Sequence, residues 1–140
     1  MWFCTWICWY NKYIALPSEL RNVIIDTETV SGHGNDDTEN FTSTDKLYLL
    51  APKEIYTDFS NSYDTAKDLT RTLDYYTSIG VTTSSYSGAT KKNGTSASNW
   101  WLRAANSNNN NYFFNVGYNG CWNNYNAISS NGVAPAFRLK

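Results

Sequence analysis

The chain has 140 residues, which is enough for one domain with a core of its own. Aromatic residues and charged residues each make up 16% of it, and the formal net charge is −1 at pH 7. Because binding to phosphates requires clustered Lys and Arg side chains, this composition excludes nucleic acid from the expected partners.

Neither a disulfide framework nor a membrane span is expected. The three cysteines are Cys4, Cys8 and Cys121, and no histidine stands near them in the sequence to complete a zinc site. We therefore expect incidental or structural thiols and no metal. No apolar run approaches the roughly 20 residues of a membrane-spanning helix, and the apolar start of the chain lacks the basic region and the cleavage site of a signal peptide.

A Trp-rich stripe opens the chain. Apolar side chains at helical spacing predict an amphipathic helix over residues 1–15, formed by Trp2, Phe3, Trp6, Ile7, Trp9, Tyr10, Tyr13 and Ile14. Three Trp within nine residues are too many to remain in solvent, so we expect this domain, a partner subunit or a second copy of the chain to bury them. Leu16-Pro17-Ser18-Glu19 predicts the start of a second helix, because proline favours the first helical turn.

The next stretch begins with a polar segment. Residues 27–44 carry no predicted strand or helix, and we interpret His33, which stands between two glycines, as a loop residue. The apolar run Lys46–Leu50 predicts a buried strand, and Ala51–Ile55, with Pro52 near its start, predicts a short helix.

One longer helix and one long loop are predicted before the C-terminal third. Asp64 is expected to cap a helix that runs to about Ser78, and Gly80 is expected to end it. Residues 81–98 are rich in Ser, Thr and Gly and predict a long loop of the kind that is functional or mobile in compact domains.

Four strands are predicted close together at the end of the chain: Asn99–Ala105, Tyr112–Tyr118, Cys121–Ala127 and Gly132–Lys140. Because the helices come before them, we expect an α+β domain with an antiparallel sheet. Asn119-Gly120 predicts a type I′ hairpin turn, which would pair Tyr118 with Cys121 and Tyr112 with Ala127. The side chains expected in the core are Trp101, Leu102, Val133 and Phe137.

Asparagine is concentrated in residues 106–131, which hold 11 of the 18 Asn in 26 positions. Asn favours neither helix nor strand, so we interpret this segment as a surface selected for contact. Flexible, low-complexity filler is the alternative reading. The expected ligand-binding residues are Asn106, Asn108, Asn109, Asn110, Asn115, Tyr118, Asn119, Trp122, Asn123, Asn124, Tyr125 and Asn126.

Two blocks frame the Asn-rich segment, namely Trp100-Trp101-Leu102-Arg103 before it and Gly132-Val133-Ala134-Pro135-Ala136-Phe137-Arg138 after it. With the upstream stretches 16–20 and 43–50, these blocks resemble a bacterial and phage domain family of C-type-lectin-like fold. The Asn-rich segment resembles the variable region of proteins that retroelements diversify. This resemblance implies a single C-type-lectin-like domain over residues 1–140, with an antiparallel sheet, a C-terminal hairpin and two to three helices.

The resemblance also implies a function. It suggests a ligand-binding display module for receptor binding or adhesion, in a phage virion or a bacterial cell, with a protein or a surface glycan as the ligand. A structural subunit of a phage particle, assembled through the Trp-rich N-terminus, is the alternative.

Two departures from related proteins bear on cofactors and activity. The sequence has no Glu-Pro-Asn motif of calcium-dependent lectins, and Trp122-Asn123-Asn124 lacks the carboxylate that calcium prefers, so we expect no cofactor. The formylglycine-generating enzymes, whose fold is similar, use paired cysteines. Because Cys121 has neither a second Cys nor a histidine near it in sequence, we expect no enzymatic activity.

Overall fold

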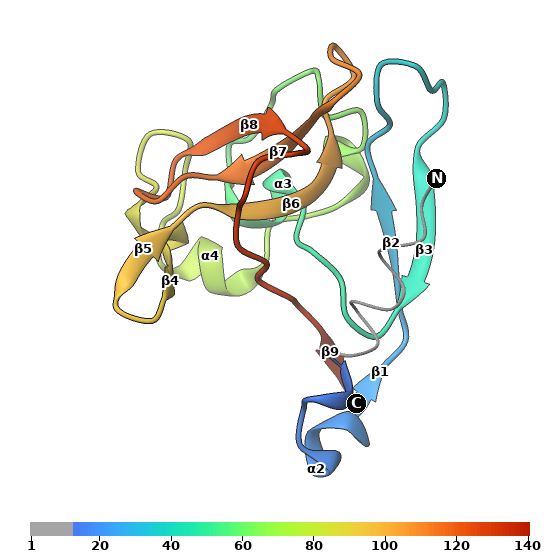
Figure 1. Cartoon of the computed structure of the whole chain (residues 1–140), viewed down its shortest axis with the longest axis vertical. Coiled ribbons are helices and arrows are strands. Elements are labelled where there is room, and N and C mark those ends of the chain that lie inside the picture. The colour runs from blue at the N-terminus through green and yellow to red at the C-terminus, as the bar shows by residue number, and fades with distance from the viewer. Residues whose placement is uncertain (1–12) are drawn as a thin grey trace.

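Short helices and four small antiparallel sheets build an α+β domain in the computed structural model, which describes residues 13–140 (Figure 1). The α+β class expected from the sequence is therefore confirmed. The predicted N-terminal helix lies mainly outside the described residues. None of the described helices is long and apolar enough to cross a membrane.

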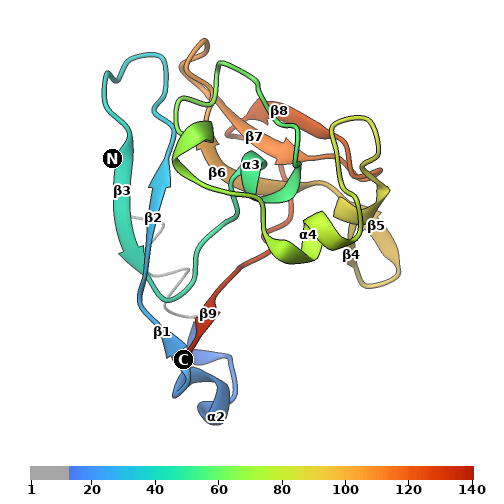
Figure 2. The same cartoon turned by 180° about the vertical axis from the view of Figure 1, so that it is seen from behind.

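A three-stranded sheet carries the core. Its strands are β6 (Trp100–Ala105), β7 (Tyr112–Val116) and β8 (Trp122–Asn126), in the order β6-β7-β8. Residues of β6 alternate between the interior and the opposite face, as a half-buried strand requires, and Trp100, Leu102 and Ala104 are each at most 2% exposed. Helices α3 (Pro52–Ile55) and α4 (Asp74–Ser78) lie on the same side of this sheet (Figure 2).

Aromatic side chains join the helices to the hairpin of β7 and β8. The ring of Phe59 meets Phe114 edge-on at a centroid distance of 5.8 Å and meets Trp122 at 5.6 Å. The hydroxyl of Tyr56, just after α3, donates a hydrogen bond of 2.6 Å to the carbonyl of Gly120 in the hairpin loop. The loop is therefore fixed to the core although it lies at the surface.

The expectation that Val133 and Phe137 are buried is wrong, because their exposed fractions are 52% and 37%. The predicted strand over residues 132–140 does not form as a unit. It makes single bridges at Gly132 and Ala136, and then only β9 (Arg138–Leu139) pairs with β1 (Ile24–Ile25), away from the main core (Figure 1).

In the first block of the frame, residues 100–103, buried and half-buried side chains alternate along the strand. Leu102 is 1% exposed, as expected, but Trp101 is only half-buried, and Trp100 is the tryptophan that fills the core.

The predicted hairpin exists, but its turn and register differ from the expectation. Strands β7 and β8 pair Val116 with Trp122 and Tyr112 with Asn126, one residue away from the predicted register. A type I′ turn needs two residues of positive φ, whereas Gly120 alone has one, at +94°. The amide of Gly120 donates to the carbonyl of Gly117. A longer loop over residues 117–121 therefore replaces the two-residue turn. The shift places Trp122 beside Phe114 on the core face.

Two further hairpins occupy segments that were predicted to be irregular. Strands β2 (Thr27–Ser31) and β3 (Phe41–Asp45) pair along their length, with His33 in the loop between them as expected. Within residues 81–98, the 3-10 helix η2 (Ser87–Ala89) precedes a hairpin of β4 (Lys91–Asn93) and β5 (Ser96–Ser98). Both hairpins lack apolar alternation on their surface strands, which is why periodicity did not reveal them.

The predicted helices are partly confirmed. Helix α2 (Ser18–Arg21) begins after Pro17 and α3 begins at Pro52, as expected. Gly80, with a φ of +68°, follows the end of α4.

Two other predictions from this part of the chain are wrong. The helix from Asp64 to Ser78 is divided into η1 (Lys67–Leu69) and α4, because the backbone at Thr70 is extended. Lys46–Leu50 is not a strand, although the side chains of Leu47, Tyr48 and Leu50 are buried.

Replacing Gly120 by Ala is expected to destabilise the domain more than replacing Gly94, which tests the anchoring of the hairpin loop. Both glycines have positive φ, so each Ala costs about 1–3 kcal/mol of backbone strain. A Cβ on Gly120 would in addition collide with the carbonyl of Tyr86, while nothing lies within 4 Å of a Cβ on Gly94. Urea unfolding of both variants measures the difference, and equal losses would contradict the close packing of this loop.

Candidate functional site

Two of the predicted ligand-binding asparagines lie inside the protein. Asn106 is 5% exposed and Asn115 is 0% exposed, so the expectation that they face a ligand is wrong. The side-chain oxygen of Asn106 accepts a hydrogen bond of 2.8 Å from the amide of Asn108. Asn115 stands opposite Trp101 on β6, and among the described residues neither atom of its amide group has a partner.

Local turns explain part of the asparagine density. The side-chain oxygens of Asn109, Asn119 and Asn126 each accept a hydrogen bond from the backbone amide two residues further on, at 3.1–3.2 Å. Asn favours such turns because its short amide imitates a backbone carbonyl. The interpretation that the asparagines of residues 106–131 were all selected for contact therefore has to be corrected. At these positions Asn shapes the loops.

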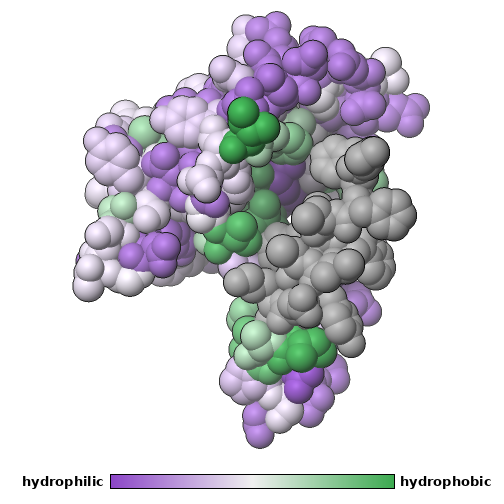
Figure 3. All heavy atoms as spheres, viewed as in Figure 1, coloured by the Kyte–Doolittle hydropathy of each residue, from purple (hydrophilic) through white to green (hydrophobic). Residues whose placement is uncertain are grey.

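The remaining predicted residues form a mixed group at the surface. Tyr118 is 65% exposed and Tyr125 is 38% exposed. Asn108 and Asn110 are exposed, whereas Trp122, Asn123 and Asn124 are half-buried. The face drawn in Figure 3 is largely hydrophilic over β7 and β8. Ile128, which follows β8, is 91% exposed.

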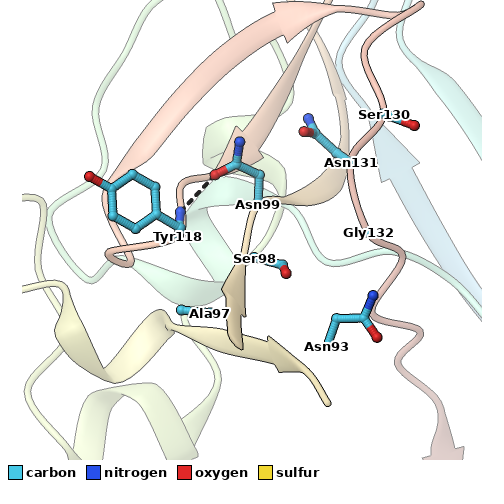
Figure 4. A pocket seen from close by; sticks show the side chains of 8 residues that line it. All are labelled: Asn93, Ala97, Ser98, Asn99, Tyr118, Ser130, Asn131 and Gly132. Atoms are coloured by element: carbon cyan, nitrogen blue, oxygen red, sulfur yellow. Dashed lines mark hydrogen bonds between the residues drawn. The ribbon is translucent and has the colours of Figure 1, made fainter. Parts of the chain in front are cut away.

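A pocket of about 510 Å³, open to solvent, lies beside the hairpin loop. It is lined by Asn93, Ala97, Ser98, Asn99, Tyr118, Ser130, Asn131 and Gly132 (Figure 4). Of these residues only Tyr118 was predicted as a site residue. The others come from the β4–β5 hairpin, the start of β6 and the C-terminal segment. The sequence carried no signal that these segments meet, because a single bridge between Trp100 and Gly132 brings them together.

Asn99 organises this pocket. Its side-chain oxygen accepts a hydrogen bond of 2.7 Å from the amide of Tyr118, and its backbone carbonyl accepts one of 2.8 Å from the amide of Gly132. One residue thus holds two loops that are far apart in sequence. Figure 4 shows the Asn131 side chain directed toward Asn99 from the opposite segment, so two amide groups converge on the pocket.

The chemistry of the lining suits hydrogen bonding and does not suit proton transfer. Its eight residues offer amides, hydroxyls and backbone groups, and none of them is a carboxylate, an imidazole, a thiol or a cation. Such groups bind a polar molecule but supply no general acid or base that works near neutral pH. Across residues 13–140, no three His, Cys, Asp or Glu side chains are grouped so as to hold a metal ion.

A second cavity of about 510 Å³ is lined in part by the charged side chains of Arg103 and Glu54. Arg103 and Glu54, both almost fully buried, form an ion pair of 2.5 Å. Arg103 also donates to the carbonyls of Val30 and Leu49, at 3.0 Å each, and Glu54 accepts from the amide of Ala51 at 2.8 Å. Because these groups are satisfied within the protein, we interpret this cluster as structural.

Removing the charge of the buried Arg103 should lower the unfolding free energy far more than removing the charge of an exposed arginine. Arg103→Met leaves the Glu54 carboxylate buried and unpaired, so we expect a loss of about 3–5 kcal/mol in unfolding free energy. Arg71, whose pair with Asp74 is exposed, is the matched control, and Arg71→Met should change the unfolding free energy far less. Chemical denaturation compares the two, and a cost below about 1 kcal/mol for Arg103→Met would show that the buried pair is not needed for stability.

Asp64 gives the domain a dependence on pH. Its side chain is 1% exposed, and burial raises the pKa of this carboxyl from 3.8 to about 6, although Arg103 and Lys67 act in the opposite direction. The folded state therefore holds the proton more tightly than the unfolded state. The resulting stabilisation is full below about pH 4 and is lost as the pH rises through about 6.

Asp64→Asn should remove this dependence. The variant cannot ionise at this position, so its stability relative to the natural protein should increase between about pH 4 and pH 7 by roughly 3 kcal/mol, the equivalent of the pKa shift. Urea unfolding across this pH range measures the difference. A difference that stays constant with pH would contradict a raised pKa for Asp64.

Comparison with known proteins gives one match. The family model for DUF6273, described as a domain of unknown function, matches residues 4–140. Neither a curated protein nor a solved structure matches the chain.

Proposed function

The chain belongs to the DUF6273 family, and we propose that this member is a ligand-binding display module with a C-type-lectin-like arrangement of its sheet and helices. The proposal draws support from the contrast between the first block of the frame, residues 100–103, and the exposed positions of the segment that follows it. Trp100, Leu102 and Arg103 are buried or paired inside the domain. Tyr118, by contrast, is among the most exposed aromatic residues.

The observation that carries the proposal is the solvent-open pocket beside the hairpin loop. Its amides and hydroxyls are held on a rigid element, because Asn99 is anchored at the start of β6 and bonds to both neighbouring loops. A site of this composition recognises a ligand without transforming it, which favours a binding protein over an enzyme.

We further propose that the module serves adhesion or receptor binding for a phage or a bacterium, and that its exposed Asn and Tyr positions tolerate diversification. Asn108 and Asn110 are exposed, and their side chains accept none of the described turn hydrogen bonds. Codons for such positions are free to change without loss of the fold. Tyr supplies large, stiff contact area and Asn supplies adaptable hydrogen bonds, the combination found in antibody binding loops.

Alanine substitutions of the asparagines should fall into two groups by their effect on the unfolding free energy. Asn108→Ala and Asn110→Ala should change the unfolding free energy by less than about 0.5 kcal/mol, because both side chains are exposed. Asn106→Ala removes a buried acceptor from the amide of Asn108 and should cost about 1–3 kcal/mol. Thermal melting of the three variants, with Trp100→Ala as the core reference, measures this. If the exposed pair unfolds the domain as strongly as Trp100→Ala does, the segment is structural.

Binding to intact cells tests the function itself. The fluorescently labelled chain is incubated with a panel of intact bacterial cells, and retention is measured by flow cytometry. We expect saturable binding to some members of the panel and its loss in the combined variant Asn108→Ala, Asn110→Ala and Tyr118→Ala. Absence of saturable binding throughout the panel, or unchanged binding by the variant, would contradict the proposal.

A further inference from the structure

We propose that the pocket beside the hairpin loop binds one uncharged sugar ring of a glycan, and that it does so without calcium. This inference rests on the proposed function and names the chemical class of its ligand. It uses residues that the sequence analysis did not assign, above all Asn99 and Asn131.

The lining selects against charged and apolar ligands. None of the eight lining residues carries a charge that would pair with a phosphate, a carboxylate or an ammonium group. Ala97 is the one aliphatic side chain among them, so an apolar ligand would find little to cover it. The amides and hydroxyls that remain both donate and accept hydrogen bonds, which matches the neighbouring hydroxyl groups of a neutral sugar.

Asn99 offers a donor that is already in position. Its side-chain oxygen is held by the amide of Tyr118, and its side-chain nitrogen donates in none of the described hydrogen bonds. The orientation of that nitrogen is therefore fixed before a ligand arrives, which lowers the entropy cost of binding. The nitrogen of Asn131 is buried and also lacks a partner among the described residues. A ligand reaches it only after a rotation of this amide, and would then satisfy it.

Tyr118 lines the pocket, and Figure 4 shows its ring directed outward, away from Asn131 and Gly132. At 65% exposed, its ring is free to change rotamer within nanoseconds. It can therefore turn over the pocket mouth and cover the C–H face of a sugar ring, which a flat aromatic surface complements.

The size of the pocket also favours a small ligand. About 510 Å³ lies within the range of about 300–1,000 Å³ typical of sites for small molecules. A folded protein partner would instead bury about 800 Å² of this domain, much of it outside the pocket.

A titration monitored by NMR tests the inference. The ¹⁵N-labelled chain is titrated in EDTA with D-glucose, D-galactose, D-mannose and N-acetyl-D-glucosamine, each up to its solubility limit. We expect at least one sugar to shift the signals of the Tyr118 and Gly132 amides and of the Asn99 side chain. Tyr118→Ala should weaken the binding of that sugar about tenfold or more, because it removes the aromatic surface that covers the sugar ring.

Tyr75→Ala is the matched control, because Tyr75 is 63% exposed but lies on α4, outside the pocket. It should leave the sugar affinity unchanged. The inference is overturned if no sugar shifts the pocket signals, if Tyr118→Ala binds as well as the natural chain, or if binding requires added calcium. If no sugar binds while cells are still retained, the display function stands and the sugar inference is overturned.

Discussion

The buried ion pair of Arg103 and Glu54 is the interaction on which the arrangement of this domain depends. Arg103 projects from β6, an edge strand of the three-stranded sheet, and its guanidinium reaches Glu54 on α3 and the carbonyl of Val30 on β2. Separating any of these segments would leave a charge or a carbonyl buried without its partner, at a cost of several kcal/mol. The pair therefore fixes the position of β6 relative to the helices and to the β2–β3 hairpin.

The pocket beside the hairpin loop is held in place by the same strand, β6. Asn99 immediately precedes β6 and bonds both to the hairpin loop at Tyr118 and to the C-terminal segment at Gly132. A strand anchored inside by Arg103 thus presents a polar pocket at its beginning. Preorganised polar groups on a rigid element bind with a smaller entropy cost than groups on a free loop, which agrees with a role in recognition.

The sequence predicted the elements that depend on neighbouring residues, but not the features that depend on contacts between distant residues. It located β6, the hairpin, the start of α3 and the glycine after α4, because each has a strong local signal. It could not tell that Gly120 packs against Tyr86, 34 residues earlier in the chain, which fixes the turn and shifts the register. Nor could it separate Asn106 and Asn109, which shape turns, from Asn108 and Asn110, which are exposed, since the residue type is the same.

On the proposed function, Trp100, Leu102 and Arg103 hold the fold, whereas the exposed Asn and Tyr are free to vary for binding. A protease-resistance scan of every single substitution across residues 99–140 separates these two roles. We expect Trp100, Leu102, Arg103 and Gly120 to tolerate almost no change, whereas Asn108, Asn110 and Tyr118 should accept most residues with resistance preserved. Equal intolerance in the two groups would show that the exposed positions are structural as well.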